Sequence, residues 1–529
     1  MVLELELVRK RGNFSRTAKL ASMTKSAIVI GAGVGGLTAA IKLADAGVHV
    51  TVVEKLDRPG GKMGEYRQDG YRWDTGPSVI TMKHIFATLF AESNRRIEDY
   101  IELVPLDPIT RYRWPDGTLL DAVSDRESMY ANMRQSGFSI KDIDGYDKFL
   151  RYAEEIYAAV RSPFLERSQP TIKEMLRLPV RDIFKIDALR NMHAAISAYT
   201  TNPKLIQLLS RFATYVGSNP FQSPATLNVI AHVELSMGAW YPRGGVYQLA
   251  LALERLAIEK GVQFQYGMPC QRIVTANGVT KGVLVGDNSP LFGDTVICDA
   301  DHTWARENLI SAASTKESNL GHKHHERDPI SERSPEPSSS GFVMLMKAST
   351  NHAELRHHNI FFCPQNSSKT EYRHIFDQLI PPTDPTIYVC ATNQTDTKHA
   401  PKGRSNWFVM VNAPYITKYS NWSVDSIGYG QEIDSTMTSR FGLSGSREVV
   451  QYWTPNTFQS TYNGNKGAIY GISSNSRLAA FKRAANRAPD IRGLYFSGGS
   501  VHPGGGVPLA VLSGTAAALC AISDFGRYG

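Results

Sequence analysis

The feature that most limits what this chain can fold into is a glycine-rich turn between an apolar run and a helix-forming stretch. The apolar run covers residues 27–30, the helix-forming stretch covers 37–46, and a second apolar run over 48–53 ends at Glu54. The turn reads G-x-G-x-x-G, with its glycines at Gly31, Gly33 and Gly36. An acid 18 residues after the last glycine completes the pattern of a β-α-β unit that binds a dinucleotide.

Each position in this pattern has a physical role. Gly31 allows the tight turn, Gly33 lets the backbone approach a pyrophosphate, and Gly36 lets helix and strand pack closely. The free N–H groups at the start of the helix attract the phosphates, and Glu54 accepts hydrogen bonds from ribose hydroxyls. An ordinary turn between a strand and a helix does not need this combination.

A second glycine pair favours FAD over NAD as the dinucleotide. Gly60 and Gly61 follow Glu54 and Lys55, within the run Arg58-Pro59-Gly60-Gly61-Lys62, and a simple NAD unit has no such pair. The segment resembles the FAD-binding superfamily of amine oxidases and phytoene desaturases, in which it approaches the flavin and its phosphates. Arg58 would then meet the pyrophosphate, because a guanidinium matches phosphate geometry. A solvated turn is the alternative.

Composition excludes several classes of protein. A chain of 529 residues has room for two or three domains, and it contains no run of 18 apolar residues that would predict a membrane-spanning helix. The five cysteines are scattered without a C-x-x-C pair, so we expect a reducing compartment, no disulfide framework and no metal site.

The charge is unevenly distributed. Residues 1–25 hold six basic and two acidic side chains, which is half of the net charge of +8. We interpret them as a leader or a disordered basic arm without the apolar core of a secretory signal. The rest of the chain is mildly basic and gives no indication of nucleic-acid binding.

The spacing of apolar residues divides the chain into parts. Residues three and four apart are apolar over long stretches before position 242, whereas strand-forming runs dominate after position 341. We therefore expect an α/β fold, in which a Rossmann-like FAD-binding domain carries an inserted helical and antiparallel-sheet substrate domain. The expected parts are the FAD-binding domain at 26–82, 243–301 and 491–529, a helical cap at 83–242, an exposed loop at 313–340, and the substrate domain at 341–490.

A second glycine-rich turn lies near the end of the chain. Five glycines fall within the nine residues 498–506, between an expected strand at 494–497 and a terminal helix. Such a turn exposes backbone N–H groups and lets a flat ring pack against the main chain. A plain structural turn would need fewer glycines.

Together these segments resemble the bacterial-type phytoene desaturase family of carotenoid desaturases and oxidases. Its signatures occur in order at 31–62, at Tyr241-Pro242-Arg243-Gly244-Gly245 and at 498–508, which spans nearly the whole chain. The G-G-S-x-H-P-G-G-G form of the last signature is similar to the 1-hydroxycarotenoid 3,4-desaturase branch and to related carotenoid oxidases. Further segments similar to that branch lie at 217–228, 358–362, 406–414 and 471–477.

The resemblance implies FAD as cofactor and a lipophilic carotenoid as substrate. It places Cys270 near the adenine and the second turn near the isoalloxazine ring. The implied cofactor-binding residues are Gly31, Gly33, Gly36, Glu54, Lys55, Arg58, Gly60, Gly61, Cys270, Gly499, Ser500, Gly504, Gly505 and Gly506.

The family's chemistry implies a desaturation in which a C–H bond beside the polyene is lost as hydride to the flavin and the neighbouring carbon loses a proton. The conjugated chain delocalises the positive charge, so a strong protein base is not required. Polar candidates for a catalytic role are Asp74, Arg243 and His502, each with a structural alternative as a turn former, an ion-pair partner or a helix cap. The catalytic group stays open.

A bilayer-resident substrate implies that the protein docks peripherally on the inner face of the membrane, from the cytoplasm. We expect the helical part, around 150–240, to form the docking face. Alternative interpretations are a phytoene desaturase, a carotenoid oxidase or an isomerase of the same fold, a flavin amine oxidase, and a non-catalytic carrier. The carotenoid end group, the bond position, the electron acceptor and the oligomeric state stay open.

Overall fold

The structure is a computed structural model that describes residues 25–168, 185–310, 335–349, 352–420, 422–476 and 483–528. The expected leader at 1–25, apart from Lys25, lies outside the described residues. The expected exposed loop at 313–340 also lies outside the described residues as far as residue 334.

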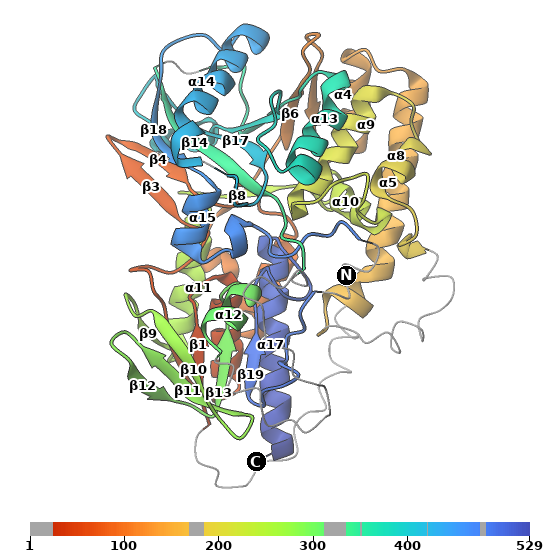
Figure 1. Ribbon diagram of the computed structural model, residues 1–529. Helices are drawn as coiled ribbons and strands as arrows, with labels where there is room; N and C mark the ends of the chain where they lie inside the picture. The colour runs from red at the N-terminus through yellow and green to blue at the C-terminus, as the bar shows by residue number, and fades with distance from the viewer. Residues whose placement is uncertain are drawn as a thin grey trace.

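A five-stranded parallel sheet forms the lower layer of the molecule (Figure 1). Its strands come from four separate stretches of the chain, because the βα connections carry the chain away and back. The order is β19 (Leu494–Phe496), β13 (Thr295–Cys298), β1 (Ser26–Ile30), β2 (His49–Val53) and β9 (Gln263–Gln265), and every pair is parallel. Three apolar helices join it in one core: α2 (Val34–Asp45), α11 (Tyr247–Glu259) and α17 (Val507–Tyr528).

A small antiparallel sheet stands beside this layer. It consists of β10 (Cys270–Ala276), β11 (Val279–Val285) and β12 (Ser289–Phe292), and the chain passes through it between β9 and β13. Helix α12 (His302–Asn308) follows β13.

A seven-stranded sheet forms the upper layer (Figure 1). All neighbours are antiparallel except β15 and β6, which run parallel. Its order is β18 (Arg447–Trp453), β14 (Ser340–Ala348), β17 (Ser405–Ala413), β16 (Ile387–Cys390), β15 (His358–Phe361), β6 (Thr110–Arg113) and β7 (Leu119–Ala122). Helix α14 (Trp422–Phe441) shares a hydrophobic core with this sheet, and α15 (Pro455–Tyr462) follows β18.

Helices gather at the β6–β7 side of this sheet, at the upper right of Figure 1. Apolar side chains from the helices and from these two strands form one core. The helices of this core are α4 (Arg126–Gln135), α5 (Ile140–Val160), α8 (Met192–Ser197), α9 (Pro203–Ser210) and α10 (Val229–Leu235). Helix α13 (Gln365–Tyr372) lies beside α9. A capping box between Ser139 and Asp142 fixes the start of α5.

Short pairs of strands connect the layers. Strands β3 (Glu65–Gln68) and β4 (Tyr71–Asp74) form a hairpin, and β5 (Leu103–Pro105) pairs with β8 (Trp240–Pro242). Helix α3 (Lys83–Glu92) packs near α17.

The expected fold class is confirmed, with an addition in the region expected to be a helical cap. That region also contains β5, β6 and β7, and the last two complete the upper sheet. These strands have only three or four residues each, too few to show an alternating pattern. Among the described residues one helix, Val507–Gly526 within α17, has the length and hydropathy to cross a membrane, but 61% of it is buried within the fold.

Candidate active site

One cavity of about 850 Å³ joins the two glycine-rich turns to the upper sheet and the helices. At its lower end it is lined by the β1–α2 turn, the Gly60–Gly61 pair and the start of α17. At its upper end it is lined by strands β14, β15 and β17 and by residues following α9 and in α10. The cavity therefore offers one end to a dinucleotide and the other to a substrate.

The first glycine turn has the close contacts that its sequence predicts. Gly31 has φ +98°, and its N–H donates to the carbonyl of Val53 at 2.8 Å. A Cβ on Gly36 would lie 2.1 Å from the carbonyl oxygen of Gly31, so only glycine lets α2 pack here. Gly33 pairs with Gly60, which brings the second glycine pair against the first turn. These side-chain-free backbones form a cradle in which a Cβ on Gly33 or Gly36 would collide with neighbouring atoms, and they fit a dinucleotide pyrophosphate.

The acid at the end of β2 points into this turn. The Glu54 carboxylate accepts hydrogen bonds from the backbone N–H groups of Ala32 (2.7 Å) and Leu56 (2.8 Å). Burial raises the pKa of Glu54, and these two hydrogen bonds oppose that rise. Cys270 lines the same end of the cavity, and burial raises the pKa of its thiol to about 12, so it stays neutral there.

Basic side chains around the glycine pair have different environments. Arg58 does not line the cavity: its side chain is 46% exposed and pairs with Asp57 at 3.2 Å. Lys62 lines the cavity, and its ammonium donates to the carbonyl of Ile469 at 2.6 Å. Lys55 also lines it, with its ammonium 3.0 Å from Oδ1 of Asn463. Lys55 and Lys62 thus line the cavity, whereas Arg58, which the sequence favours for the pyrophosphate, does not.

Asp299 lies beneath the first glycine turn and was not expected from the sequence. A Cβ on Gly33 or Gly35 would lie 2.3 Å from its carboxylate oxygens, so the carboxyl group touches the turn directly. Burial raises the pKa of Asp299 to about 7, against a hydrogen bond from the hydroxyl of Ser497 and the charge of Lys62. The residue directly follows β13, where the sequence indicates only the close of a domain.

The second glycine turn closes over the start of α17. Gly499, Ser500, Gly505 and Gly506 line the cavity, and Gly505 packs against the ring of Tyr470. Gly504 lies behind them, facing Arg483.

Arg483 fixes this turn by binding its backbone. Its guanidinium donates to the carbonyls of Gly499 (3.0 Å), Tyr470 (3.3 Å) and Ile472 (3.3 Å). Burial lowers the pKa of Arg483 to about 10, so it is still charged at neutral pH. No local pattern marks such a residue, because its role depends on carbonyl groups brought together by the fold.

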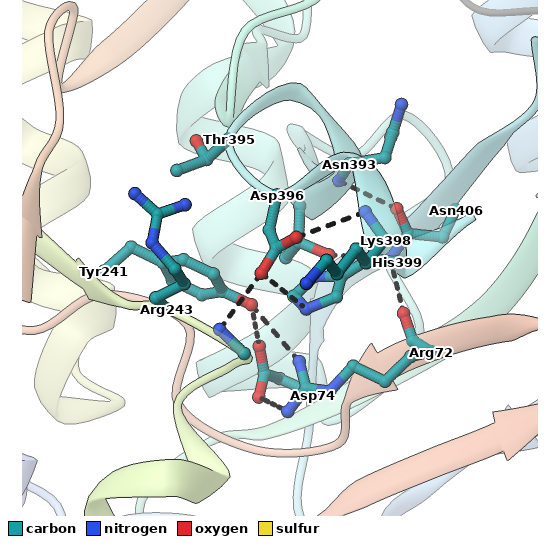
Figure 2. A network of polar contacts seen from close by, with 12 residues as sticks. Arg72, Asp74, Tyr241, Arg243, Asn393, Thr395, Asp396, Lys398, His399 and Asn406 are labelled. Carbon is teal, nitrogen blue, oxygen red and sulfur yellow. Dashed lines mark hydrogen bonds and ion pairs between the residues drawn. The ribbon is translucent and has the colours of Figure 1, made fainter. Parts of the chain in front are cut away.

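Asp74 is the centre of a buried network outside the cavity wall (Figure 2). Its carboxylate accepts hydrogen bonds from Arg72 (2.6 Å), from the hydroxyl of Tyr241 (2.7 Å) and from the N–H of Val246 (2.8 Å). The guanidinium of Arg72 packs on Gly245, where a Cβ would lie 1.8 Å from it. The network thus joins β4, β8 and the start of α11.

Arg243 and His502 also lie outside the cavity wall. Arg243 is half-exposed, points away from Asp74 (Figure 2) and forms two hydrogen bonds to Glu102 at 2.6 and 2.8 Å. His502 is buried, and its Nε2 contacts the carbonyls of Phe164 (2.9 Å) and Arg167 (3.0 Å). Burial lowers the pKa of His502 to about 4, so this ring is neutral, and it tethers the second turn to the segment that follows α5.

The upper end of the cavity is largely apolar. Val343, Phe408 and Met410 face it from the sheet, and Ile230 and Val233 face it from α10. This surface suits a hydrocarbon chain, because burying apolar area on both sides is favourable.

The residues that the structure describes contain one group of three potential metal ligands. His357, His358 and Cys390 are buried and place ligand atoms within 4.8 Å of one another. Nδ1 of His357 already contacts Thr395 (2.7 Å), and Nδ1 of His358 contacts Tyr388 (2.8 Å). The group thus forms part of the hydrogen bonding around β15 and β16.

Comparison with known proteins shows the family. The model of the flavin containing amine oxidoreductase family matches residues 34–522. The 4,4'-diaponeurosporene oxygenases of Staphylococcus haemolyticus (strain JCSC1435) and Staphylococcus aureus (strain MSSA476) are each 32% identical to this chain. Both alignments cover 93% of this chain, and 95% and 97% of the respective relatives.

Solved structures show the same fold at low identity. An oxidoreductase from Methanosarcina mazei has a TM-score of 0.60 at 18% identity, covering 93% of this chain and 99% of that one. A putrescine oxidase double mutant has a TM-score of 0.58 at 14% identity, covering 95% of this chain and 100% of that one.

Proposed function

The chain belongs to the flavin-containing amine oxidoreductase family and is an FAD-dependent oxidoreductase, and within that family we propose that it desaturates a carotenoid. The proposed substrate is a 1-hydroxycarotenoid and the proposed new double bond is at the 3,4 position. Relatives named as carotenoid oxygenases, at 32% identity over almost the full chain, support the substrate class.

The observation that carries this proposal is the continuity of the cavity. A glycine cradle with Glu54 and Lys62 at one end opens into an apolar space between β14, β17 and α10. FAD, when bound, supplies a two-electron acceptor, and the protein's part is to bind, to orient and to exclude water. Met410 and Phe408 would hold the polyene in line with the second glycine turn.

Desaturation is best tested by product analysis. The chain would be expressed in bacteria that make carotenes or 1-hydroxycarotenes, and pigments would be analysed by chromatography and mass spectrometry. Desaturation removes two hydrogens and lengthens the conjugated system. A Gly33→Val variant is the matched control, because its side chain would collide with Asp299 and fill the cradle. Unchanged pigments in every background would refute the proposal.

Oxygenation is the second candidate function, favoured by the names of the relatives. It would add oxygen to the product and leave a terminal aldehyde or related group. The same mass measurement separates the two reactions, because one product loses two hydrogens and the other gains oxygen.

We also propose that the protein meets its substrate at the inner membrane surface, through the helical side of the molecule. A lipophilic substrate requires such access, and Leu189, close before α8, is 73% exposed. Flotation with anionic liposomes tests it. Leu189→Glu should reduce binding, whereas Phe292→Glu, at a 71% exposed position on β12, should not. Flotation no greater than that of a protein without membrane affinity would refute the proposal.

A further inference from the structure

A buried ion pair interrupts the apolar upper end of the cavity. Arg211, directly after α9, donates from Nη2 to the carboxylate of Glu234 in α10 at 2.8 Å. The same nitrogen donates to the hydroxyl of Tyr112 in β6 at 2.6 Å. Arg211 and Glu234 are 7% and 1% exposed, and both line the cavity.

Aromatic rings hold the guanidinium in place. The Cζ atom of Arg211 lies 4.5 Å from the ring centre of Phe212, 5.1 Å from that of Tyr112 and 5.2 Å from that of Tyr215. The hydroxyl of Tyr215 also donates to Glu234. Burial alone would lower the pKa of Arg211, but Tyr112, Tyr215 and Glu234 raise that pKa well above its usual value. The group is therefore a fixed cation.

Part of this guanidinium has no protein partner. Within the described chain, the hydrogen bonds of Arg211 as a donor come from Nη2 alone, and Nε is buried without a partner. Buried polar groups are nearly always hydrogen-bonded, because leaving a donor unpaired away from water is costly. An unpaired, charged donor in a cavity wall therefore indicates a ligand that carries an acceptor.

Stability alone does not explain the pair. Replacing a buried ion pair with apolar side chains is often neutral or favourable, and a cavity for a pure hydrocarbon would gain apolar surface from that change. The desolvation cost of burying this ion pair is offset if Arg211 donates a hydrogen bond to an oxygen atom on the substrate end that reaches α9 and α10.

We propose that Arg211 binds the oxygen of a hydroxyl or carbonyl end group of the carotenoid, and so selects oxygenated polyenes over hydrocarbon carotenes. Glu234, Tyr112 and the surrounding rings position Arg211 for that contact. The inference rests on the proposed carotenoid substrate and assigns the residue that chooses among carotenoids.

Binding and turnover would be measured separately on the FAD-loaded protein in detergent. The probes are a 1-hydroxycarotene, a carotenoid with a terminal carbonyl, and the hydrocarbon carotene with the same conjugated chain. Binding is read from the shift in polyene absorbance, and turnover from anaerobic bleaching of the flavin. A hydrogen bond from a charged donor predicts roughly 10- to 100-fold tighter binding of an oxygenated carotenoid.

Arg211→Lys keeps a cation beside Glu234 but loses the planar fork of donors, and should lower this preference about tenfold. If that variant does not retain FAD, the double variant Arg211→Met with Glu234→Met removes the pair as a unit and should abolish the preference. Arg190→Lys is the matched control, because Arg190 is exposed, pairs with Asp187 and lies outside the cavity wall.

Equal binding of oxygenated and hydrocarbon carotenoids by the unaltered protein would overturn the inference. So would variants that weaken both classes equally, because a merely structural pair would behave in that way. Failure of the proposed function looks different: the selected carotenoid binds, but the flavin is not bleached and no product forms.

Discussion

Replacing Asp74 separates a structural role from a catalytic one, because its carboxylate is fully engaged away from the cavity. Arg72, Tyr241 and the N–H of Val246 all donate to it, and Asp74 is 4% exposed. The network joins β4 to the start of α11, so the expected effect of substitution is on folding and FAD retention.

The magnitude follows from the donors left behind. Asp74→Ala leaves three buried donors without an acceptor and breaks a buried ion pair, which costs about 3–5 kcal/mol in the free energy of unfolding. Asp74→Asn keeps one oxygen for Arg72 and Val246, and Arg72 keeps Glu65 at 2.9 Å. The loss there is about 2 kcal/mol, the worth of hydrogen bonds to a charged group.

Denaturant unfolding followed by circular dichroism gives the stability, and stopped-flow flavin reduction gives the chemical rate per bound FAD. We expect both variants to be less stable, with Ala worse than Asn, while the rate per bound FAD stays close to that of the unaltered protein. Arg243→Ala is the control, because its exposed pair with Glu102 contributes under about 1 kcal/mol.

The opposite pattern would refute this reasoning. A residue that takes a proton in the reaction contributes about 10²- to 10⁴-fold to the rate. If Asp74→Asn were as stable as the unaltered protein but lost that much rate, Asp74 would act in the chemistry.

Three further predictions concern the first glycine turn and the residues around it. Because the pKa of Asp299 is about 7 without cofactor, and nearby phosphates would raise it further, binding takes up a proton. FAD affinity, measured by quenching of flavin fluorescence, should therefore be highest below pH 7 and fall above it. Asp299→Asn should flatten the profile, and a flat profile in the unaltered protein would contradict this. Lys62→Met should lower FAD affinity at least about tenfold, which is the effect of losing one charge-assisted contact. Arg58→Met should leave FAD affinity unchanged. Equal losses in the two variants would show that both cations reach the phosphates. Gly36→Ala would place a Cβ 2.1 Å from the carbonyl of Gly31 and should cost about 1–3 kcal/mol; an unchanged midpoint of unfolding would contradict this.

The elements predictable from the sequence are those with a local physical cause. The apolar runs at 27–30 and 48–53 form β1 and β2, because short apolar stretches of that length suit buried strands. The strand-forming sequence expected after position 341 includes β14 and β17. Strand β6 was missed because its side chains are Thr, Arg, Tyr and Arg, and its pairing with β15 depends on residues nearly 250 positions later. Pairing over such a distance leaves no local pattern.

The same distinction divides the site residues. Gly31, Gly36 and Glu54 act through the strand, turn and helix that contain them, so spacing alone predicts their positions. Asp74 and Tyr241 lie 167 residues apart, and each looks like a turn former or a motif residue until the fold pairs them.

The Tyr241–Gly245 signature therefore has a structural explanation that needs no contact with substrate. The hydroxyl of Tyr241 binds Asp74, and Gly245 makes room for Arg72. A motif can thus recur in a family because it orients α11 and β4 beneath the cofactor cradle. Residues that choose the substrate are to be sought instead among groups like Arg211. It lines the cavity, keeps one buried donor unpaired and belongs to none of the three glycine-rich signatures.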